Sequence, residues 1–329
     1  ATVREFKAAL SELKAKGMND LILDLSYNGG GYLNRAIELA DEFLEDKQKI
    51  VYTEGKSNPR RESFATNKGG FEKGKLVVMI NESSASASEI VSGAVQDWDR
   101  GLIVGRRTFG KGLVQKQYPL SDGSAVRLTI ARYYTPSGRC IQKPYGSEVD
   151  YRADISNRFK SGELMSEDSI HIADSLLYYT NGKRAVYGGG GIMPDVFVPL
   201  DTNMNSKYYS NLLRKAVLNT YTLTYVDDNR KKLAADYPDI KTFKEKFKLP
   251  ASLMDDFVEY ADDKGVKFNE EQFNTSEVII KTQIKALIAR NIWNADAYSQ
   301  IFNSINPIFL KAVEVMNDDT FKNNKIASY

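Results

Sequence analysis

Two short apolar runs constrain the fold of this chain more than any other feature of its sequence. Residues 21–25 read LILDL and residues 75–81 read KLVVMIN. Each run is followed at once by a loop of small residues and then by an amphipathic helix pattern. Such runs are typical of strands buried in a parallel sheet. Strands that alternate with helices indicate an α/β fold with crossover connections.

The same periodicities place the other expected elements of the first 200 residues. Apolar side chains at helical spacing predict helices over residues 2–16, 33–44 and 86–98. Short apolar segments predict further strands over residues 49–53, 102–105 and 124–134. Residues 145–190 are less regular and lead into a run of four glycines, which indicates a loop.

The character of the sequence changes near residue 203. Strand patterns end there, and charged amphipathic helix patterns continue to the C-terminus, for example over residues 276–292. We therefore expect an α/β domain over residues 1–202 and an all-helical module over residues 203–329.

Composition excludes several classes of protein. The 329 residues include 45 Lys+Arg and 43 Asp+Glu, a net charge of +2. This balance is not the electrostatic footprint of a nucleic-acid or anionic-membrane binder, so no nucleic-acid partner is expected. No apolar run approaches the 18 residues of a membrane-spanning helix. The first residues, ATVREFKAAL, lack the apolar core of a signal peptide, so any export signal is expected in a longer precursor.

The chain has one cysteine, Cys140, and one histidine, His171. These numbers exclude a His/Cys zinc site within one chain and a disulfide framework. His171 lies in SEDSIHIADSLLYY, where apolar residues at helical spacing predict an amphipathic helix. A lone helical histidine is more often a surface or core residue than a base. If the chain performs acyl transfer, its base is expected to be another residue.

Two segments carry residues suited to acyl transfer. In the first, Ser86 stands between the buried run 75–81 and a helix, where free backbone N–H groups can stabilise an oxyanion. In the second, Lys111 stands between Gly110 and Gly112, which allow a close approach to a serine. A desolvated lysine can act as a neutral base.

Each segment also has a simpler interpretation. Ser86-Ala87-Ser88-Glu89 matches the S-x-x-E capping box, so Ser86 can be a helix cap alone. Gly-Lys-Gly is often a solvated turn. The glycines at 29–31 suggest a phosphate loop, but both the G-x-G-x-x-G spacing and a following Lys-Ser/Thr are missing. On pattern alone, acyl transfer competes with a nucleotide-binding or acyl-carrier-binding α/β domain.

Four ordered blocks resemble one known family over roughly residues 5–200. They are LILDLSYNGGGYL, VVMINESSASASEIVSGAVQDWDRG, GRRTFGKGLVQKQYPLSDGSAVRLTIARYYTPSGRCI and GGGGIMPDVFV. Together they resemble the carboxy-terminal processing (tail-specific) proteases of peptidase family S41, which use a Ser/Lys dyad. The resemblance implies a crotonase-like (ClpP/crotonase-type) core with a mixed sheet and crossover helices, followed here by the helical module.

The resemblance also assigns roles at the positions that match the family motifs. The nucleophile is the central serine of the S-A-S-A-S-E-I block, Ser86, rather than Ser84 or Ser88. The base is Lys111 of the T-F-G-K-G block, and Gln115 orients that lysine.

The expected oxyanion hole consists of two backbone N–H groups, those of Ala87 and Gly30. Glycine suits this position because its backbone can approach a substrate carbonyl without a Cβ in the way. No metal or organic cofactor is expected.

By resemblance, the substrates are proteins or peptides with apolar or small C-terminal residues, in the bacterial periplasm or otherwise outside the cytoplasm. The helical module is expected to serve packing, formation of a homo-oligomer or docking of an adaptor. Two other functions stay open: a catalytically idle peptide-binding scaffold and a crotonase-like acyl-CoA enzyme.

The sequence departs from the family pattern in two places. Asp24-Leu25-Ser26 stands where the family usually has Asp-Leu-Arg, a change expected to affect local packing. The family normally carries a PDZ domain and a strand upstream, and nothing here matches the PDZ signature. We therefore expect the chain to be an N-terminally truncated fragment. The missing strand would leave an exposed edge or apolar surface unless another chain covers it.

Overall fold

The computed structural model describes residues 2–145, 151–171, 173–324 and 326. Contacts divide the chain into two compact units. Unit 1 contains Ala1–Pro199 and Lys311–Tyr329, and unit 2 contains Leu200–Leu310. The described residues from Lys311 onward, which were expected in the helical module, thus group with the α/β unit.

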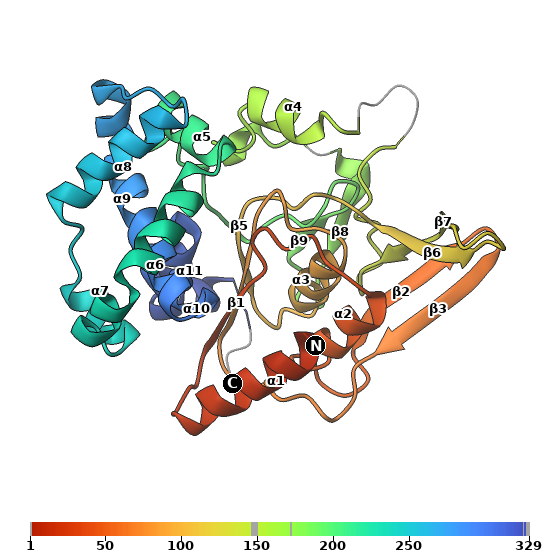
Figure 1. The fold of residues 1–329 in the computed structure, drawn as a ribbon. Helices are drawn as coiled ribbons and strands as arrows, with labels where there is room; N and C mark the ends of the chain where they lie inside the picture. Colours follow the sequence, from red (N-terminus) through yellow and green to blue (C-terminus); the bar gives the residue numbers. More distant parts are fainter. Residues whose placement is uncertain (1, 146–150, 172, 325, 327–329) are drawn as a thin grey trace. The chain divides into compact units, whose positions relative to one another are not determined.

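A four-stranded parallel sheet forms the centre of unit 1 (Figure 1). Its strands, in spatial order, are β1 (Leu21–Asp24), β4 (Leu76–Ile80), β5 (Leu102–Gly105) and β10 (Val196–Phe197). Every residue of β4 and β5 is buried, as the apolar runs predict. The strands β1 and β4 end at the same edge, so the loops that follow them lie close together.

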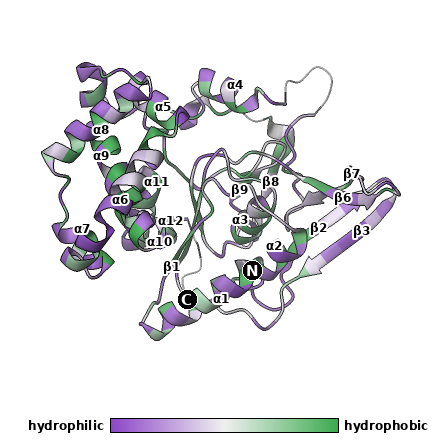
Figure 2. Cartoon of the chain, in the orientation of Figure 1, coloured by the Kyte–Doolittle hydropathy of each residue, from purple (hydrophilic) through white to green (hydrophobic). Residues whose placement is uncertain are grey.

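A second, antiparallel sheet has four strands in the order β3 (Asn58–Phe64), β2 (Lys49–Gly55), β7 (Ala125–Tyr134) and β6 (Leu113–Pro119). Neither β3 nor β6 was predicted from the sequence. Both are rich in polar residues, and Figure 2 draws β3 in hydrophilic colours. The parallel and antiparallel strands therefore lie in separate sheets rather than in the single mixed sheet that was expected.

Unit 1 contains helices α1 (Thr2–Ala15), α2 (Leu33–Ala40), α3 (Ala87–Asp97) and α4 (Asp154–Lys160). The first three were predicted. Every residue of α3 is buried, and α3 packs against α2, β2 and β5. A helix buried on all sides can hold the residues at its N-terminus in a fixed place.

The helix predicted around His171 is wrong. The described residues there form 3₁₀ turns over Glu167–Ser169 and Asp174–Leu176, followed by β8 (Leu177–Tyr179); Ile172 lies outside the described residues. β8 pairs with β9 (Ala185–Tyr187) in a two-stranded hairpin. Strand pairing thus overrides the helical spacing of the apolar side chains.

Unit 2 is built from helices around its own apolar core. The helices are α5 (Lys207–Arg214), α6 (Val217–Asp236), α7 (Ile240–Lys246), α8 (Ala251–Asp263), α9 (Glu270–Ile292) and α10 (Ala295–Phe302). Helix α11 (Pro307–Asn317) crosses the division between the units, and α12 (Thr320–Asn323) belongs to unit 1. In the part of the chain that the structure describes, no helix combines the length and apolarity needed to span a membrane.

Candidate active site

Ser86 stands at the turn between β4 and α3, in an unusual backbone conformation. Its φ is +58° and its ψ is −114°. Positive φ is uncommon outside glycine, and an ordinary N-cap residue has extended dihedrals. Such a conformation costs about 1–3 kcal/mol and persists only where the surroundings enforce it. A capping role alone would not require this strain.

The two neighbouring serines of the motif are occupied by structural hydrogen bonds. The fully buried Ser84 hydroxyl donates to the Leu25 carbonyl at 2.7 Å and accepts the Asn81 N–H at 3.0 Å. The Ser88 hydroxyl donates to the Asn28 carbonyl at 2.9 Å. Both hydroxyls hold the loop between β4 and α3, residues 81–86 (the nucleophile loop), against the segment that follows β1.

The glycine loop after β1 lies directly against Ser86. Gly30 has a φ of +89°, and a Cβ on it would stand 2.5 Å from the Ala85 carbonyl oxygen and 2.6 Å from the Ala87 nitrogen. Only glycine fits this place. The Gly30 N–H donates to Asn28 Oδ1 at 2.9 Å. The Ala87 N–H, at the first residue of α3, has no acceptor within the helix.

The carboxylate of Glu89 joins the nucleophile loop to the loop between β5 and β6, residues 106–112, which carries Lys111 (the lysine loop). Its Oε2 accepts the N–H groups of Ser86 at 2.7 Å and Lys111 at 2.9 Å. Its Oε1 accepts the Gly110 N–H at 2.7 Å and the Thr108 hydroxyl at 2.5 Å. Burial raises the pKa of the Glu89 carboxyl, and these four hydrogen bonds oppose the shift. One buried side chain therefore fixes the main chains of both expected dyad residues.

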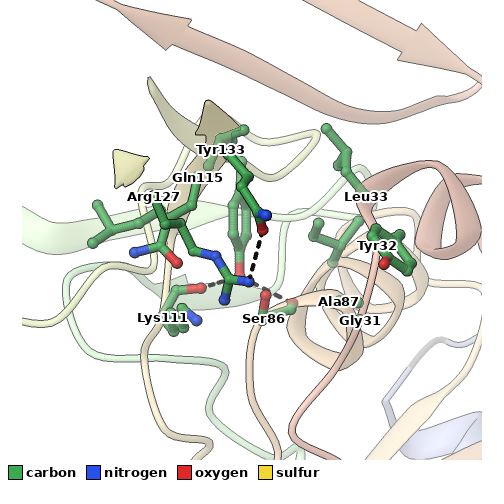
Figure 3. Close-up of a pocket in the computed structure, with 13 residues that line it drawn as sticks. Gly31, Tyr32, Leu33, Ser86, Ala87, Lys111, Gln115, Arg127 and Tyr133 are labelled. Atoms are coloured by element: carbon green, nitrogen blue, oxygen red, sulfur yellow. Dashed lines mark hydrogen bonds between the residues drawn. The ribbon is translucent and has the colours of Figure 1, made fainter. Parts of the chain in front are cut away.

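Tyr133 on β7 makes a second bridge between the same two residues. Its buried hydroxyl donates to the main-chain carbonyl of Ser86 at 3.0 Å and to that of Lys111 (Figure 3). Burial raises the pKa of the Tyr133 hydroxyl well above its ordinary value, so it stays a protonated donor. Ser86 and Lys111 are thus joined through their N–H groups and through their carbonyls.

Ser86, Lys111 and Gln115 line one cavity of about 450 Å³. Its other lining residues are Gly31, Tyr32, Leu33, Ala87, Ile90, Leu113, Val114, Gln117, Arg127 and Tyr133 (Figure 3). Lys111 is half-buried, whereas Gln115 is exposed on β6. Within the described residues, no hydrogen bond joins Lys111 Nζ to Ser86 Oγ. Both side chains nevertheless line the same cavity.

Every residue that the resemblance singled out lies in or beside this cavity. Ser86, Ala87, Lys111 and Gln115 line it, and Gly30 packs against Ser86. His171 is exposed and does not line it. In the described part of the chain, no group of three or more His, Cys, Asp or Glu side chains is placed to hold a metal ion.

The bridging roles of Glu89 and Tyr133 were not predicted from the sequence. The sequence indicated only a capping box for Glu89, and one hydrogen bond of that box, from the Ser86 N–H to the Glu89 carboxylate, is present. The other three donors come from residues 19 to 22 positions later. Tyr133 stands in the quoted ARYYTPSG block, where an aromatic residue of a strand gives no sign of a role at the site.

Comparison with known proteins finds relatives for part of this chain. Residues 1–153 match the family model of peptidase family S41, and residues 208–294 match a family of unknown function (DUF8443). The carboxyl-terminal-processing protease of Synechocystis sp. is 42% identical over 140 residues, which cover 43% of this chain and 32% of that protein. The carboxy-terminal-processing protease of Bartonella bacilliformis is 44% identical over 146 residues, covering 43% of this chain and 33% of that one.

Among solved structures, a photosystem II D1 C-terminal processing protease is 30% identical, with a TM-score of 0.43. The match covers 60% of this chain and 39% of that one. The chain thus spans about a third of the length of the curated relatives it matches.

Proposed function

We propose that this chain is a serine endopeptidase of the carboxy-terminal processing type, because residues 1–153 match the family model of peptidase family S41 and resemble curated processing proteases. Its nucleophile is Ser86 and its general base is Lys111. The observation that carries the proposal is the strained Ser86, held at the N-terminus of a buried helix in one cavity with Lys111. An idle binding scaffold would have no need of this strain.

The first half of the reaction forms an acyl-enzyme. Ser86 Oγ attacks the scissile carbonyl carbon while its proton passes to neutral Lys111 Nζ. The resulting oxyanion lies near the N–H groups of Ala87 and Gly30. Since the Gly30 N–H is bonded to Asn28 Oδ1, that bond must yield when the oxyanion forms. Collapse of the intermediate breaks the C–N bond, and protonated Lys111 gives its proton to the leaving amine.

The second half releases the product. Lys111, neutral again, takes a proton from water, and the hydroxide equivalent attacks the ester carbonyl. Breakage of the ester C–O bond returns the proton to Ser86 Oγ and frees a carboxylate product. Gln115 lines the same cavity and is proposed to orient the lysine amine. No step requires a metal or an organic cofactor.

The wider assignments rest on the same family resemblance. We propose a crotonase-type arrangement, in which the loops after β1 and β4 supply the oxyanion donors and the nucleophile. The proposed substrates are proteins or peptides with apolar C-terminal residues, met outside the cytoplasm of a bacterium. Unit 2 is proposed to form a homo-oligomer contact or an adaptor site.

Ser86→Ala tests the proposal. A fluorophosphonate probe should label the unaltered protein at one site and should fail to label Ser86→Ala, because only an activated serine reacts. Peptide hydrolysis should fall by at least about 10⁴-fold. The free energy of unfolding should change by about 1 kcal/mol or less, since the strained main chain is held by Glu89 and Tyr133.

Ser84→Ala is the matched control. It removes a buried hydroxyl with two structural hydrogen bonds, so it should lower stability by about 1–3 kcal/mol and keep measurable hydrolysis. Full activity of Ser86→Ala would overturn the assignment. Turnover of acyl-CoA thioesters with no peptide cleavage would favour the acyl-CoA enzyme instead.

A further inference from the structure

We propose that Arg127 binds a carboxylate of the substrate in the nucleophile cavity and thereby sets the substrate preference. This inference rests on the proposed peptidase function. The carboxylate comes either from the C-terminus of the substrate or from an acidic side chain near the scissile bond. Both sources offer the same planar anion to the guanidinium, and the experiment below separates them.

The position of Arg127 follows from the register of the β6–β7 hairpin. Gln117 pairs with Arg127 and Gln115 pairs with Thr129 across the two strands. Side chains alternate between the faces of a strand, so these residues share one face. Arg127, Gln115 and Gln117 all line the cavity that holds Ser86, and Figure 3 shows the guanidinium extended into it.

The charge of the cavity is unbalanced. All thirteen lining residues belong to the described part of the chain. Two of them, Lys111 and Arg127, are basic, and none of the thirteen is acidic. Because Lys111 acts as a neutral base in the proposed reaction, Arg127 is the lining residue that keeps a positive charge, and this charge favours an anionic ligand group.

The guanidinium of Arg127 is weakly engaged by the protein itself. Its hydrogen bond to Gln117 Oε1 is 3.4 Å long, near the outer limit for such a bond. This contrasts with Arg107, which reaches the Glu163 carboxylate at 2.6 and 2.8 Å, and with Arg139, which reaches Asp97 at 2.7 Å. The guanidinium of Arg127 can therefore donate two parallel hydrogen bonds to a carboxylate, in the bidentate geometry that arginine prefers.

Lys116 provides a matched control on the same hairpin. It pairs with Leu128, on the opposite face from Arg127, lines neither the nucleophile cavity nor the neighbouring one, and stands over the Tyr118 ring. Lys116→Gln and Arg127→Gln remove the same charge from neighbouring places. A difference between the two variants therefore reports on the cavity rather than on net charge.

The experiment measures kcat/KM for three fluorescent peptides of one sequence. The first ends in Gln with a free carboxylate, the second ends in Gln with an amide, and the third ends in Glu with an amide. We expect the unaltered protein to prefer a carboxylate peptide over the neutral one by about tenfold or more. Preference for the first peptide identifies the chain terminus as the source, and preference for the third identifies the acidic side chain.

Arg127→Gln should reduce this preference to about twofold or less by raising KM for the carboxylate peptides, with little change for the neutral one. Arg127→Lys should keep part of it, because charge remains and the bidentate geometry is lost. Lys116→Gln should keep all of it. Equal kinetics on all three peptides in the unaltered protein, or an undiminished preference in Arg127→Gln, would overturn the proposal.

A binding measurement separates this proposal from the proposed catalysis. Fluorescence anisotropy with Ser86→Ala, with and without Arg127→Gln, gives peptide affinities that do not depend on turnover. If the unaltered protein cleaves nothing, the peptidase proposal fails. Tighter binding of carboxylate peptides that is lost with Arg127→Gln would then still support the site, and equal affinities would overturn it.

Discussion

The nucleophile cavity has two walls of opposite character. One wall is the junction of the nucleophile loop and the lysine loop, where Ser86 and Lys111 are joined by Glu89 and Tyr133. The other is the face of the β6–β7 hairpin that carries Gln115, Gln117 and Arg127, all exposed. The junction is fixed by short hydrogen bonds to buried side chains. On the hairpin face, the one side-chain hydrogen bond that these three residues make within the described part of the chain is the 3.4 Å contact between Arg127 and Gln117.

This difference suggests how the two walls divide the work. Acyl transfer requires its nucleophile and base to be held in place before the substrate arrives. Recognition can use longer side chains that adjust to the substrate. Changes in the junction should therefore remove turnover for every substrate, and changes on the hairpin face should alter the order of preference among substrates.

After Ser86→Ala, the largest effect within the junction is expected from Lys111→Arg. A guanidinium cannot act as a base near neutral pH, so kcat should fall by about 10³-fold or more on every peptide. The fold should persist, because Glu89 and Tyr133 hold the main chain of this residue and not its side chain.

Steady-state kinetics between pH 6 and 10 check this prediction, with Lys116→Arg as the control on the neighbouring strand. The control should stay within about twofold of the unaltered protein. Near-normal rates for Lys111→Arg would mean that the position supplies positive charge alone.

The next largest effect is expected from Gly30→Ala, because the added methyl group would clash with the main chain of the nucleophile loop. The new Cβ would stand 2.5 Å from the Ala85 carbonyl oxygen, and the φ of +89° disfavours any side chain. We expect kcat/KM to fall by about 10²-fold and the free energy of unfolding by about 1–3 kcal/mol. Gly29→Ala meets no atom within 4 Å, so it should keep near-normal activity and stability. Equal behaviour of the two variants would disprove the close approach.

A smaller effect is expected from Glu89→Gln. Each carboxylate oxygen accepts two donors, so an amide nitrogen in either place leaves two buried donors without an acceptor. The free energy of unfolding should fall by at least about 2 kcal/mol and kcat/KM by about tenfold. Glu62→Gln, on the surface strand β3, changes the same charge and should cost about 1 kcal/mol or less. Unchanged activity of Glu89→Gln would mean that the junction is held by Tyr133 alone.

The pH dependence of stability tests the environment of Glu89 separately. Burial raises the pKa of this carboxyl above its ordinary value of 4.5. Its contribution to stability is therefore complete below about pH 4.5 and is lost as pH rises through the folded-state pKa, because the unfolded chain releases the proton first. The stability advantage of the unaltered protein over Glu89→Gln, measured by urea denaturation, should shrink as pH rises. An advantage that grows with pH would mean that the hydrogen bonds outweigh burial.

The two walls also differ in how far the sequence predicted them. The apolar runs predicted β1 and β4, and the helix pattern predicted α3, so the loops that carry Gly30 and Ser86 were placed correctly. Local pattern was sufficient there because burial dictates the residue types.

The β6–β7 hairpin and the hydrogen bonds of Glu89 and Tyr133 were harder to predict from the sequence. β6 was not predicted, because polar residues such as Gln115, Lys116 and Gln117 give no strand pattern when both faces of a strand are exposed. The four donors of Glu89 and the two acceptors of Tyr133 are brought together by tertiary packing, which no local pattern records.

The smallest effect is expected from Tyr133→Phe, which removes one bridge of the junction and keeps the ring in place. The main-chain carbonyls of the half-buried Ser86 and Lys111 lose this donor, yet that of Ser86 still accepts the N–H groups of Glu89 and Ile90 at 2.9 and 3.1 Å. The free energy of unfolding should fall by about 1 kcal/mol and kcat/KM by about two- to fivefold, equally for the three peptides that test Arg127. Tyr134→Phe, the next residue along β7, is the matched control and should change neither. If Tyr133→Phe instead changed the preference among those peptides, the two walls would be coupled. Catalysis by the junction could then not be separated from substrate selection by the hairpin face.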